Sequence, residues 1–421
     1  MKEILAQIKP SQKEQQHCAR STVTFLSKLT KALLARKLGA KAILGGSGAK
    51  GTWLAGSHDI DIFVIFDFKR YAQKSDQLSD VLEPVLKKSF PSQKITRLHG
   101  SRDYFQLVFQ KLNFEVVPIL NITKAEDAVN ITDVSPLHSV WVNQHTKGLK
   151  EEVLLAKQFC KAQGLYGAES YINGFSGYVL EILIAHYGSF LKLLQASWKW
   201  SVKEVIDAGK HYAQKDALFE LNQSKLQSPL IVIDPVDKSR NAAAALSMDK
   251  FLLMKKKAKE YLAKPGLEFF VPKEMTPAAL KKEAEQKRLN GIIIIAAPLS
   301  GKKDVVGVKL MKVFEFLQEK LTLFSVKESG WEWEQKKEAL LYFFLEKREL
   351  PQYEIQAGPP TAMKEFVKDF TRKHKDTYIE KGRIMAKVKR EQYQLAGVVK
   401  ALLKEKYVKE RVAKVSKVMV V

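Results

Sequence analysis

The sequence predicts a multidomain α+β protein, and its length and two changes of pattern along the chain carry that prediction. The 421 residues exceed one ordinary domain and indicate two to four. Strand and helix patterns mix over the first ~140 residues, and helical spacing then dominates to about residue 262. A break at Pro265–Gly266 opens a third stretch that carries both patterns.

The first stretch opens on a helix and continues into strands. Ser11 and Glu14 form a capping box, and apolar residues at helical spacing continue to Gly39, a predicted stop. Pro84 predicts a kink or a restart in a later helix. The elements expected here are strands at 42–44 and 60–66, a helix at 77–89, and strands at 104–109 and 112–117.

The two later stretches differ in kind. The second is predicted to be mostly helical, and the third to mix strands with helices. Lys-rich helical segments are expected to close the chain. The elements expected are helices at 151–163, 174–194 and 241–262, then a strand at 291–296, a helix at 309–321 and a strand at 340–345.

Basic residues outnumber acidic ones along the whole chain. Lys and Arg number 70 against 46 Asp and Glu, a net charge of +24. Residues 361–421 hold 17 basic and 7 acidic residues, so they carry +10 of this charge and the remainder is distributed. A distributed excess suits a long phosphate backbone better than a single docking arm does. On charge alone, an anionic membrane surface and plain solubility stay open.

Composition argues against several other classes. Hydrophobic residues make up 46% of the chain, which is enough for packed cores. The longest apolar run, at 292–298, is far shorter than the roughly 20 residues that a membrane span needs. The N-terminus lacks a signal-peptide pattern, and Cys18 and Cys160 make no disulfide framework. We therefore expect a protein of the reducing cytoplasm with no membrane partner.

Residues 45–66, GGSGAKGTWLAGSHDIDIFVIF, carry the strongest chemical pattern. A Gly-Gly-Ser turn that opens a short helix leaves backbone N–H groups free to cradle phosphate. Asp59 and Asp61 alternate with Ile60 and Ile62 on an apolar strand, so both carboxylates lie on one face. Close carboxylates repel unless a cation lies between them, and Mg²⁺ prefers such oxygen ligands. Two metals about 3.5–4 Å apart could hold an attacking hydroxyl and a departing pyrophosphate.

A third carboxylate is expected from a neighbouring strand, and Glu115 is the candidate. It lies in the apolar run 112–118, where a charge is costly without a partner. Each feature alone has an ordinary alternative: a plain turn, an exposed strand or a solvated strand edge. Their order and spacing together are much harder to obtain by chance, so the joint pattern favours metal-assisted phosphate chemistry.

These residues and many others resemble the nucleotidyltransferase superfamily of DNA polymerase β, and within it the archaeal-type, class I CCA-adding enzymes. The matching segments follow that family's order across nearly the whole chain. They are GTWLAGS at 51–57, SPLH at 135–138, LAKQFC at 155–160, GLYG at 164–167, GFSGY at 174–178, HYGSF at 186–190, IDPVD at 233–237 with Arg240–Asn241, LEFF at 267–270, and Leu350–Pro351 through Gly358–Pro359–Pro360.

This resemblance implies a polymerase-β-like nucleotidyltransferase catalytic domain, a helical neck, and an α/β body and tail. The implied reaction is template-independent addition of C, C and A to the 3′ end of tRNA. The terminal ribose hydroxyl attacks the α-phosphorus of CTP or ATP, and pyrophosphate leaves. The implied boundaries are 1–142 for the head, 143–262 for the nucleotide- and primer-binding neck, 263–305 plus 390–421 for the body, and 306–389 for the tRNA-binding tail.

The resemblance assigns catalysis to the acidic set. Asp59, Asp61 and Glu115 are implied as the catalytic metal ligands, with magnesium the expected cofactor. The family usually has Glu-x-Asp followed by a later Asp, so two positions trade side-chain length by one methylene. Lys50 and Val134 each stand where the family usually has Arg. The change at Lys50 keeps the charge but removes the bidentate fork.

A second set of residues is implied to contact the incoming nucleotide. Ser47 and Lys50 would touch the triphosphate, and the planar fork of Arg240 would read the base edge together with the RNA backbone. An ion pair of Arg240 with Asp234 or Asp237 is the structural alternative. The full nucleotide-binding set is Ser47, Lys50, His138, Lys157, Tyr166 and Arg240.

Plain structural roles stay open for several other residues. His138 could cap a helix, Lys157 could lie on the surface, and Tyr166 could pack in a core. Trp331 and Trp333 flank a predicted loop, where core packing is preferred over stacking on RNA.

The implied partners are tRNA, gripped at its acceptor stem and T arm, and the substrates CTP and ATP. The family often dimerises, so a homodimer is an allowed state. Two rival functions remain. A related polymerase, such as a poly(A) or oligoadenylate synthetase, would differ in nucleotide choice. A non-catalytic RNA-binding relative would bind tRNA without releasing pyrophosphate, and the exchanged acidic residues are its only support.

Overall fold

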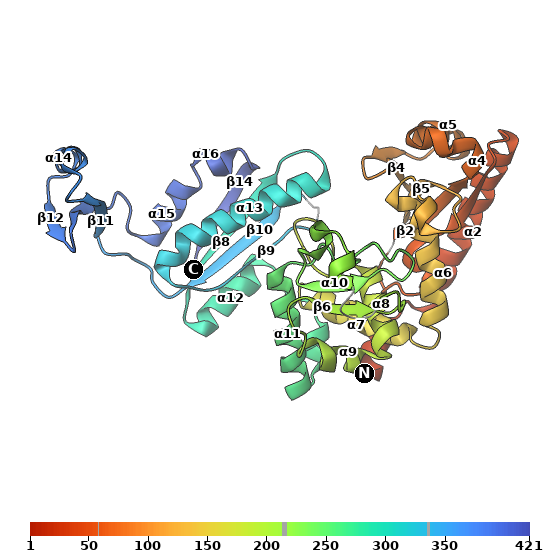
Figure 1. The fold of residues 1–421 in the computed structure, drawn as a ribbon, viewed down its shortest axis with the longest axis horizontal. Coiled ribbons are helices and arrows are strands. Elements are labelled where there is room, and N and C mark those ends of the chain that lie inside the picture. The colour runs from red at the N-terminus through yellow and green to blue at the C-terminus, as the bar shows by residue number, and fades with distance from the viewer. Residues whose placement is uncertain (58, 213–216, 335–336) are drawn as a thin grey trace. The chain divides into compact units, whose positions relative to one another are not determined.

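The computed structural model of the chain describes residues 1–57, 59–212, 217–334 and 337–421. The chain forms two compact units, Met1–Lys273 and Glu274–Val421, and Figure 1 shows the elements of each.

The first part of the first unit is a five-stranded sheet with helices. The strand order is β1-β2-β5-β4-β3, and β2 and β5 run parallel while the other neighbours are antiparallel. The elements are α1 (Lys2–Ile8), α2 (Gln12–Ala35), β1 (Ala40–Leu44), α3 (Gly46–Lys50), β2 (Asp59–Phe66), α4 (Phe68–Tyr71), α5 (Leu78–Ser89), β3 (Thr96–Leu98), β4 (Tyr104–Phe109), β5 (Leu112–Leu120) and α6 (Ser135–His145).

One face of this sheet is covered by α2 and α5 (Figure 1). The capping box at Ser11 starts α2 as predicted, and α5 runs through Pro84 without ending. Alternate residues of β2 pack into this core beside Phe25 of α2, namely Ile60, Ile62, Val64 and Phe66. Since side chains alternate along a strand, Asp59 and Asp61 belong to the opposite face.

The remainder of the first unit is mostly helical, as predicted. Its elements are α7 (Lys150–Ala162), α8 (Gly177–Tyr187), α9 (Phe190–Ser197), β6 (Glu204–Asp207), α10 (Ala217–Glu220), β7 (Leu230–Ile233) and α11 (Met248–Ala263). Within the described residues no single helix is long and apolar enough to span a membrane, although α8 and α9 pass that test as a pair bent by 95°.

Two predicted helices of this region have different limits in the structure. The helix expected at 174–194 is two helices, because Gly188 adopts a left-handed conformation (φ 81°) that ends α8. The helix expected at 241–262 begins only at Met248, where the hydroxyl of Ser247 accepts a hydrogen bond from the Lys250 N–H.

The second unit contains two antiparallel sheets, ordered β14-β8-β10-β9 and β11-β13-β12. The first packs α13 on one face and α12 on the other. The elements are α12 (Pro277–Lys287), β8 (Asn290–Pro298), α13 (Lys303–Leu321), β9 (Val326–Glu332), β10 (Ala339–Leu345), β11 (Tyr353–Pro360), α14 (Lys364–Lys373), β12 (Thr377–Glu380), β13 (Arg383–Lys389), α15 (Leu395–Leu402), α16 (Lys406–Lys409) and β14 (Val412–Val420).

The structure of the second unit bears on three predictions made from the sequence. Trp331 and Trp333 pack against the core under α13, in keeping with the packing interpretation. The expectation of closing Lys-rich helices was wrong at the end of the chain, because β14 pairs with β8 there. Residues 306–345, expected in the tail, place α13, β9 and β10 around the same sheet as β8 and β14 of the expected body.

Candidate active site

The acidic residues meet where β2 and β5 run side by side. In this parallel pairing Asp61 lies opposite Glu115 and Asp59 lies opposite Asn113. The side-chain amide of Asn113 donates to Asp59 Oδ1 at 3.1 Å, and the amide of Gln106 on β4 donates to Glu115. The structure therefore brings the three predicted carboxylates to one end of two adjacent strands.

The Gly-Gly-Ser turn lies directly against the middle carboxylate. The Gly45 N–H donates to the Asp61 carbonyl at 2.8 Å, which ties the turn to β2. Gly46 has a left-handed backbone (φ 53°), and a Cβ built there would lie 1.6 Å from Asp61 Oδ2. Only glycine fits this position, because both the conformation and the space exclude a side chain. The turn opens α3, which carries Ser47, as the sequence predicts.

The electrostatics of this site fit a divalent cation. Burial, and then the nearby charge of Glu115, raise the pKa of Asp61 to about 6, while the Lys50 ammonium acts in the opposite direction. Like charges held this close are stabilised when a cation lies between them, and oxygen ligands suit a hard one. Within residues 1–57, 59–212, 217–334 and 337–421, no group of three or more His, Cys, Asp or Glu side chains is already close enough together to hold a metal ion.

Asp59, Asp61 and Glu115 define the acidic face of the sheet, and a buried cluster of charged side chains lies next to it. Glu181 of α8 accepts hydrogen bonds from Lys50 Nζ at 2.7 Å, Lys157 Nζ at 2.8 Å and Thr52 Oγ1 at 2.6 Å. The Lys157 ammonium also donates to the Thr52 carbonyl at 3.0 Å. The side chains of Lys50, Lys157 and Glu181 are only 10%, 4% and 1% exposed. The surface alternative for Lys157 was therefore wrong.

Burial and ion pairing both shift the pKa values of Lys157 and Glu181. Burial lowers the pKa of Lys157, and the charge of Glu181 acts in the opposite direction. Burial alone would raise the pKa of Glu181, but the charges of Lys157 and Lys50 lower it. Both lysines that the sequence assigns to the nucleotide are thus tied to one carboxylate.

A second cluster forms around Asp234, which is fully buried. Its carboxylate accepts from Arg240 Nη1 at 2.6 Å and from the Tyr178 hydroxyl at 2.9 Å, and it lies 3.1 Å from His138 Nε2. The His138 ring also stacks on Tyr178, with centroids 4.1 Å apart. Burial would raise the pKa of Asp234, but the hydrogen bond from His138 and the nearby charges lower it to about 2.

The predicted residues His138 and Arg240 therefore converge, and the ion pair of Arg240 with Asp234 exists as the structural alternative expected. The Arg240 side chain is still 32% exposed, so part of its guanidinium faces outward. Tyr166 lies partly buried at a bridge with Phe175, and a Cβ built on Gly177 would lie 3.0 Å from its hydroxyl. Burial raises the pKa of Tyr166 to about 12.

Sequence reasoning missed Glu181 and its partner Thr52. It named Asp234 only as a possible ion-pair partner of Arg240 and missed the hydrogen bond that this carboxylate accepts from Tyr178. Both acids stand in apolar runs, YVLEILI and LIVID, where an unpaired charge is costly. That pattern, which pointed to Glu115, could have found them.

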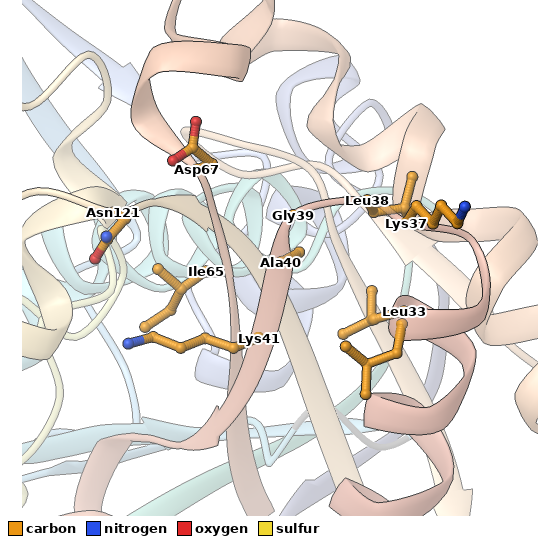
Figure 2. A pocket seen from close by; sticks show the side chains of 10 residues that line it. Leu33, Lys37, Leu38, Gly39, Ala40, Lys41, Ile65, Asp67 and Asn121 are labelled. Carbon is orange, nitrogen blue, oxygen red and sulfur yellow. The ribbon is translucent and has the colours of Figure 1, made fainter.

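A cavity of about 480 Å³ lies at the other end of β2 (Figure 2). Leu33, Leu38 and Ile65 give it an apolar side, and Lys41 and Asp67 give it a charged one. All of its lining residues differ from the predicted site residues, so the acidic site and this cavity are separate.

Known families match three successive parts of the chain. The model described as tRNA nucleotidyltransferase, second domain, matches residues 151–271, and the one described as CCA-adding enzyme, C-terminal domain, matches 304–419. Residues 1–152 match the Second Messenger Oligonucleotide or Dinucleotide Synthetase domain.

Three curated relatives from archaea are CCA-adding enzymes. The CCA-adding enzyme of Sulfurisphaera tokodaii is 30% identical over 97% of this chain and 93% of its own. That of Methanosarcina acetivorans is 31% identical over 82% and 76%. That of Nanoarchaeum equitans is 47% identical over 50% and 52%.

The fold has solved relatives as well. A structure of Cid1, described with RNA terminal uridylyl transferase activity, aligns with a TM-score of 0.51 at 14% identity, over 65% of this chain and 97% of that one. At this identity the likeness concerns the fold, which is the multidomain α+β arrangement of polymerase-β-like nucleotidyltransferases. The sequence relatives show that the chain belongs to the archaeal-type CCA-adding enzymes, the tRNA nucleotidyltransferases that add C, C and A to the 3′ end of tRNA from CTP and ATP.

Proposed function

We propose that Asp59, Asp61 and Glu115 form the catalytic centre for this reaction and hold Mg²⁺. The observation that carries the proposal is the pairing of Asp61 with Glu115 on adjacent parallel strands, against a glycine whose missing side chain leaves room for the carboxylate. When bound, a divalent cation supplies charge neutralisation at the transferring phosphate. The amide donors on Asp59 and Glu115 orient these carboxylates, and the turn at Gly45 fixes Asp61.

The nucleotide lies, in this proposal, between the acidic face and the helices that follow. Ser47 and the N–H groups at the start of α3 contact the triphosphate, with Lys50 beside them. His138, Lys157 and Tyr166 line the phosphates and ribose. Support comes from the structure around them, since Lys50 and Lys157 share Glu181 and the rings of His138 and Tyr178 stack.

Arg240 selects the base in this proposal. Asp234 accepts one hydrogen bond from Nη1, which leaves the other donors of the guanidinium available to a base edge and a phosphate. The exposed part of the side chain supports this assignment.

We propose that the body and the tail, predicted at 263–305 plus 390–421 and at 306–389, bind the acceptor stem and T arm of tRNA. The outer face of the sheet β11-β13-β12 supports a role in RNA binding. Tyr353, Ile355 and Tyr378 are 47%, 51% and 41% exposed there. Lys389 and Lys387 lie opposite Tyr353 and Ile355, and Lys387 Nζ lies 4.9 Å from the Tyr353 ring centroid. Exposed aromatic and basic side chains are typical of surfaces that bind RNA. The homodimer stays a prediction.

The experiment that tests the catalytic centre uses tRNA lacking its 3′ CCA and all four nucleotides. Wild-type protein with Mg²⁺ should add C, C and A and stop, and Asp61→Asn should form no product while still binding tRNA. Asp67→Asn is the matched control, because Asp67 follows the opposite end of β2 and its role as a helix cap tolerates Asn. Asp61→Asn extending tRNA at the wild-type rate would refute the assignment. Long tails made from ATP alone would favour the rival polymerase function.

A further inference from the structure

The buried cluster around Glu181 joins two parts of the first unit. Lys50 and Thr52 lie at and just after the end of α3, next to the acidic face, whereas Lys157 lies on α7 and Glu181 on α8. These residues are far apart in sequence, since Lys50 and Glu181 are 131 positions apart. The Glu181 carboxylate therefore links the end of α3, beside the acidic face, to the helices α7 and α8.

The charges of the cluster do not cancel. Two lysines share one carboxylate, which is a formal excess of one positive charge, and the three side chains are at most 10% exposed. A buried excess charge of this kind is costly without a partner. Lys50 acts electrostatically on Asp61, which places the excess charge beside the acidic face. The carboxylates of the acidic face offset this charge while they hold no metal, and an anionic phosphate would take over that part once a divalent cation binds them.

The position of Glu181 on α8 connects this cluster to the second one. Tyr178 lies three residues earlier, so it shares a face of α8 with Glu181. The Lys50 ammonium lies 5.4 Å from the Tyr178 ring centroid, and the Tyr178 hydroxyl donates to Asp234. One face of α8 thus contacts both the lysines and the group that holds Arg240.

We propose that Glu181 is a positioning residue for the incoming nucleoside triphosphate. It holds the ammonium groups of Lys50 and Lys157 in place before the nucleotide arrives, so that the triphosphate meets cations that are already positioned. Lys157 uses its three N–H donors on Glu181 and Thr52, so it acts on the phosphates through its charge. This inference rests on the proposed function, and it predicts an effect on nucleotide binding with no matching effect on tRNA binding.

The test measures steady-state KM for CTP and for tRNA, with melting temperature, in Glu181→Gln. An amide in place of the carboxylate turns an NH₂ group toward one ammonium, so that lysine leaves its place. We expect KM for CTP to rise about tenfold or more, and KM for tRNA to stay within about twofold. Thr52→Val removes the hydrogen bond from this hydroxyl to Glu181 and the one that it accepts from Lys157 Nζ at 3.1 Å, but it leaves both ion pairs of Glu181. It should therefore raise KM for CTP less, in the same direction.

Asp133→Asn is the matched control for stability. Asp133 is also buried and pairs with the buried Arg102 in the same unit, remote in its contacts from the Glu181 cluster. If Glu181 served stability alone, Glu181→Gln would lose melting temperature as Asp133→Asn does and keep the wild-type KM for CTP. That result would overturn the proposal, and so would a lower KM for CTP. The proposed function fails separately, by activity of Asp61→Asn in the same assay.

Discussion

Gly46→Ala adds a single methyl group to the protein and tests how closely the turn and the acidic face are fitted. The new Cβ would lie 1.6 Å from Asp61 Oδ2, so this oxygen would have to move by roughly 1.8 Å to reach an ordinary contact of 3.4 Å. A displacement of about 1 Å at a reacting group can cost about 100-fold in rate, so we expect single-turnover addition of C to fall by about 100-fold or more. The left-handed backbone adds a loss of folding stability of about 1–2 kcal/mol.

Gly56→Ala separates the two effects. Gly56 also has a positive φ, of 74°, but a Cβ built there has nothing within 4 Å. It should therefore lose similar stability and keep its rate of C addition within about threefold of wild type. The assay is single-turnover incorporation into tRNA lacking CCA, with thermal melting of both variants. If Gly46→Ala turned over as fast as Gly56→Ala, the close approach of the turn to Asp61 would have no catalytic meaning.

Three further predictions follow from the charges and the exposed rings. Asp234, whose pKa is lowered to about 2 by His138 and Arg240 against the effect of burial, should contribute roughly 2 kcal/mol to stability above about pH 4, lost as the pH falls toward 2. Denaturant unfolding of Asp234→Asn should lack this pH dependence, and an unchanged slope would contradict it. The net charge of +24 predicts that KM for tRNA rises about tenfold or more between ~50 and ~200 mM KCl, while KM for CTP changes little; equal changes would exclude phosphate-backbone binding as the reason. Replacing Tyr353 and Tyr378 together by Ala should weaken tRNA binding by about tenfold in a filter-binding assay, and unchanged affinity would remove this face from the RNA surface.

The parts of the fold that the sequence predicted are those with strong local patterns. Strand β2 was found because its apolar run and alternating aspartates have period two. Strand β14 was missed because its lysines and valines, VAKVSKVMV, resemble a Lys-rich surface segment, and its pairing with β8 is irregular. The break between α8 and α9 depends on the backbone of Gly188, which periodicity does not record.

The candidate site likewise contains contacts that the sequence could predict and contacts that it could not. The convergence of Asp61 and Glu115 could be predicted, because neighbouring apolar strands bring such residues together. The pairing of Lys50 with Glu181 could not, because 131 positions separate them and only the packing of α3 against later helices decides the partner. The sequence therefore identified charged residues of the candidate site, whereas the tertiary structure determines which of them form ion pairs.

Binding of Mn²⁺, measured by electron paramagnetic resonance in the presence of CTP, tests the central claim most directly. Wild-type protein and Asp67→Asn should bind the ion alike, whereas Asp61→Asn and Glu115→Gln should each weaken binding by about tenfold or more. Unchanged Mn²⁺ affinity in both acidic-face variants would contradict the claim that these carboxylates hold the catalytic ion.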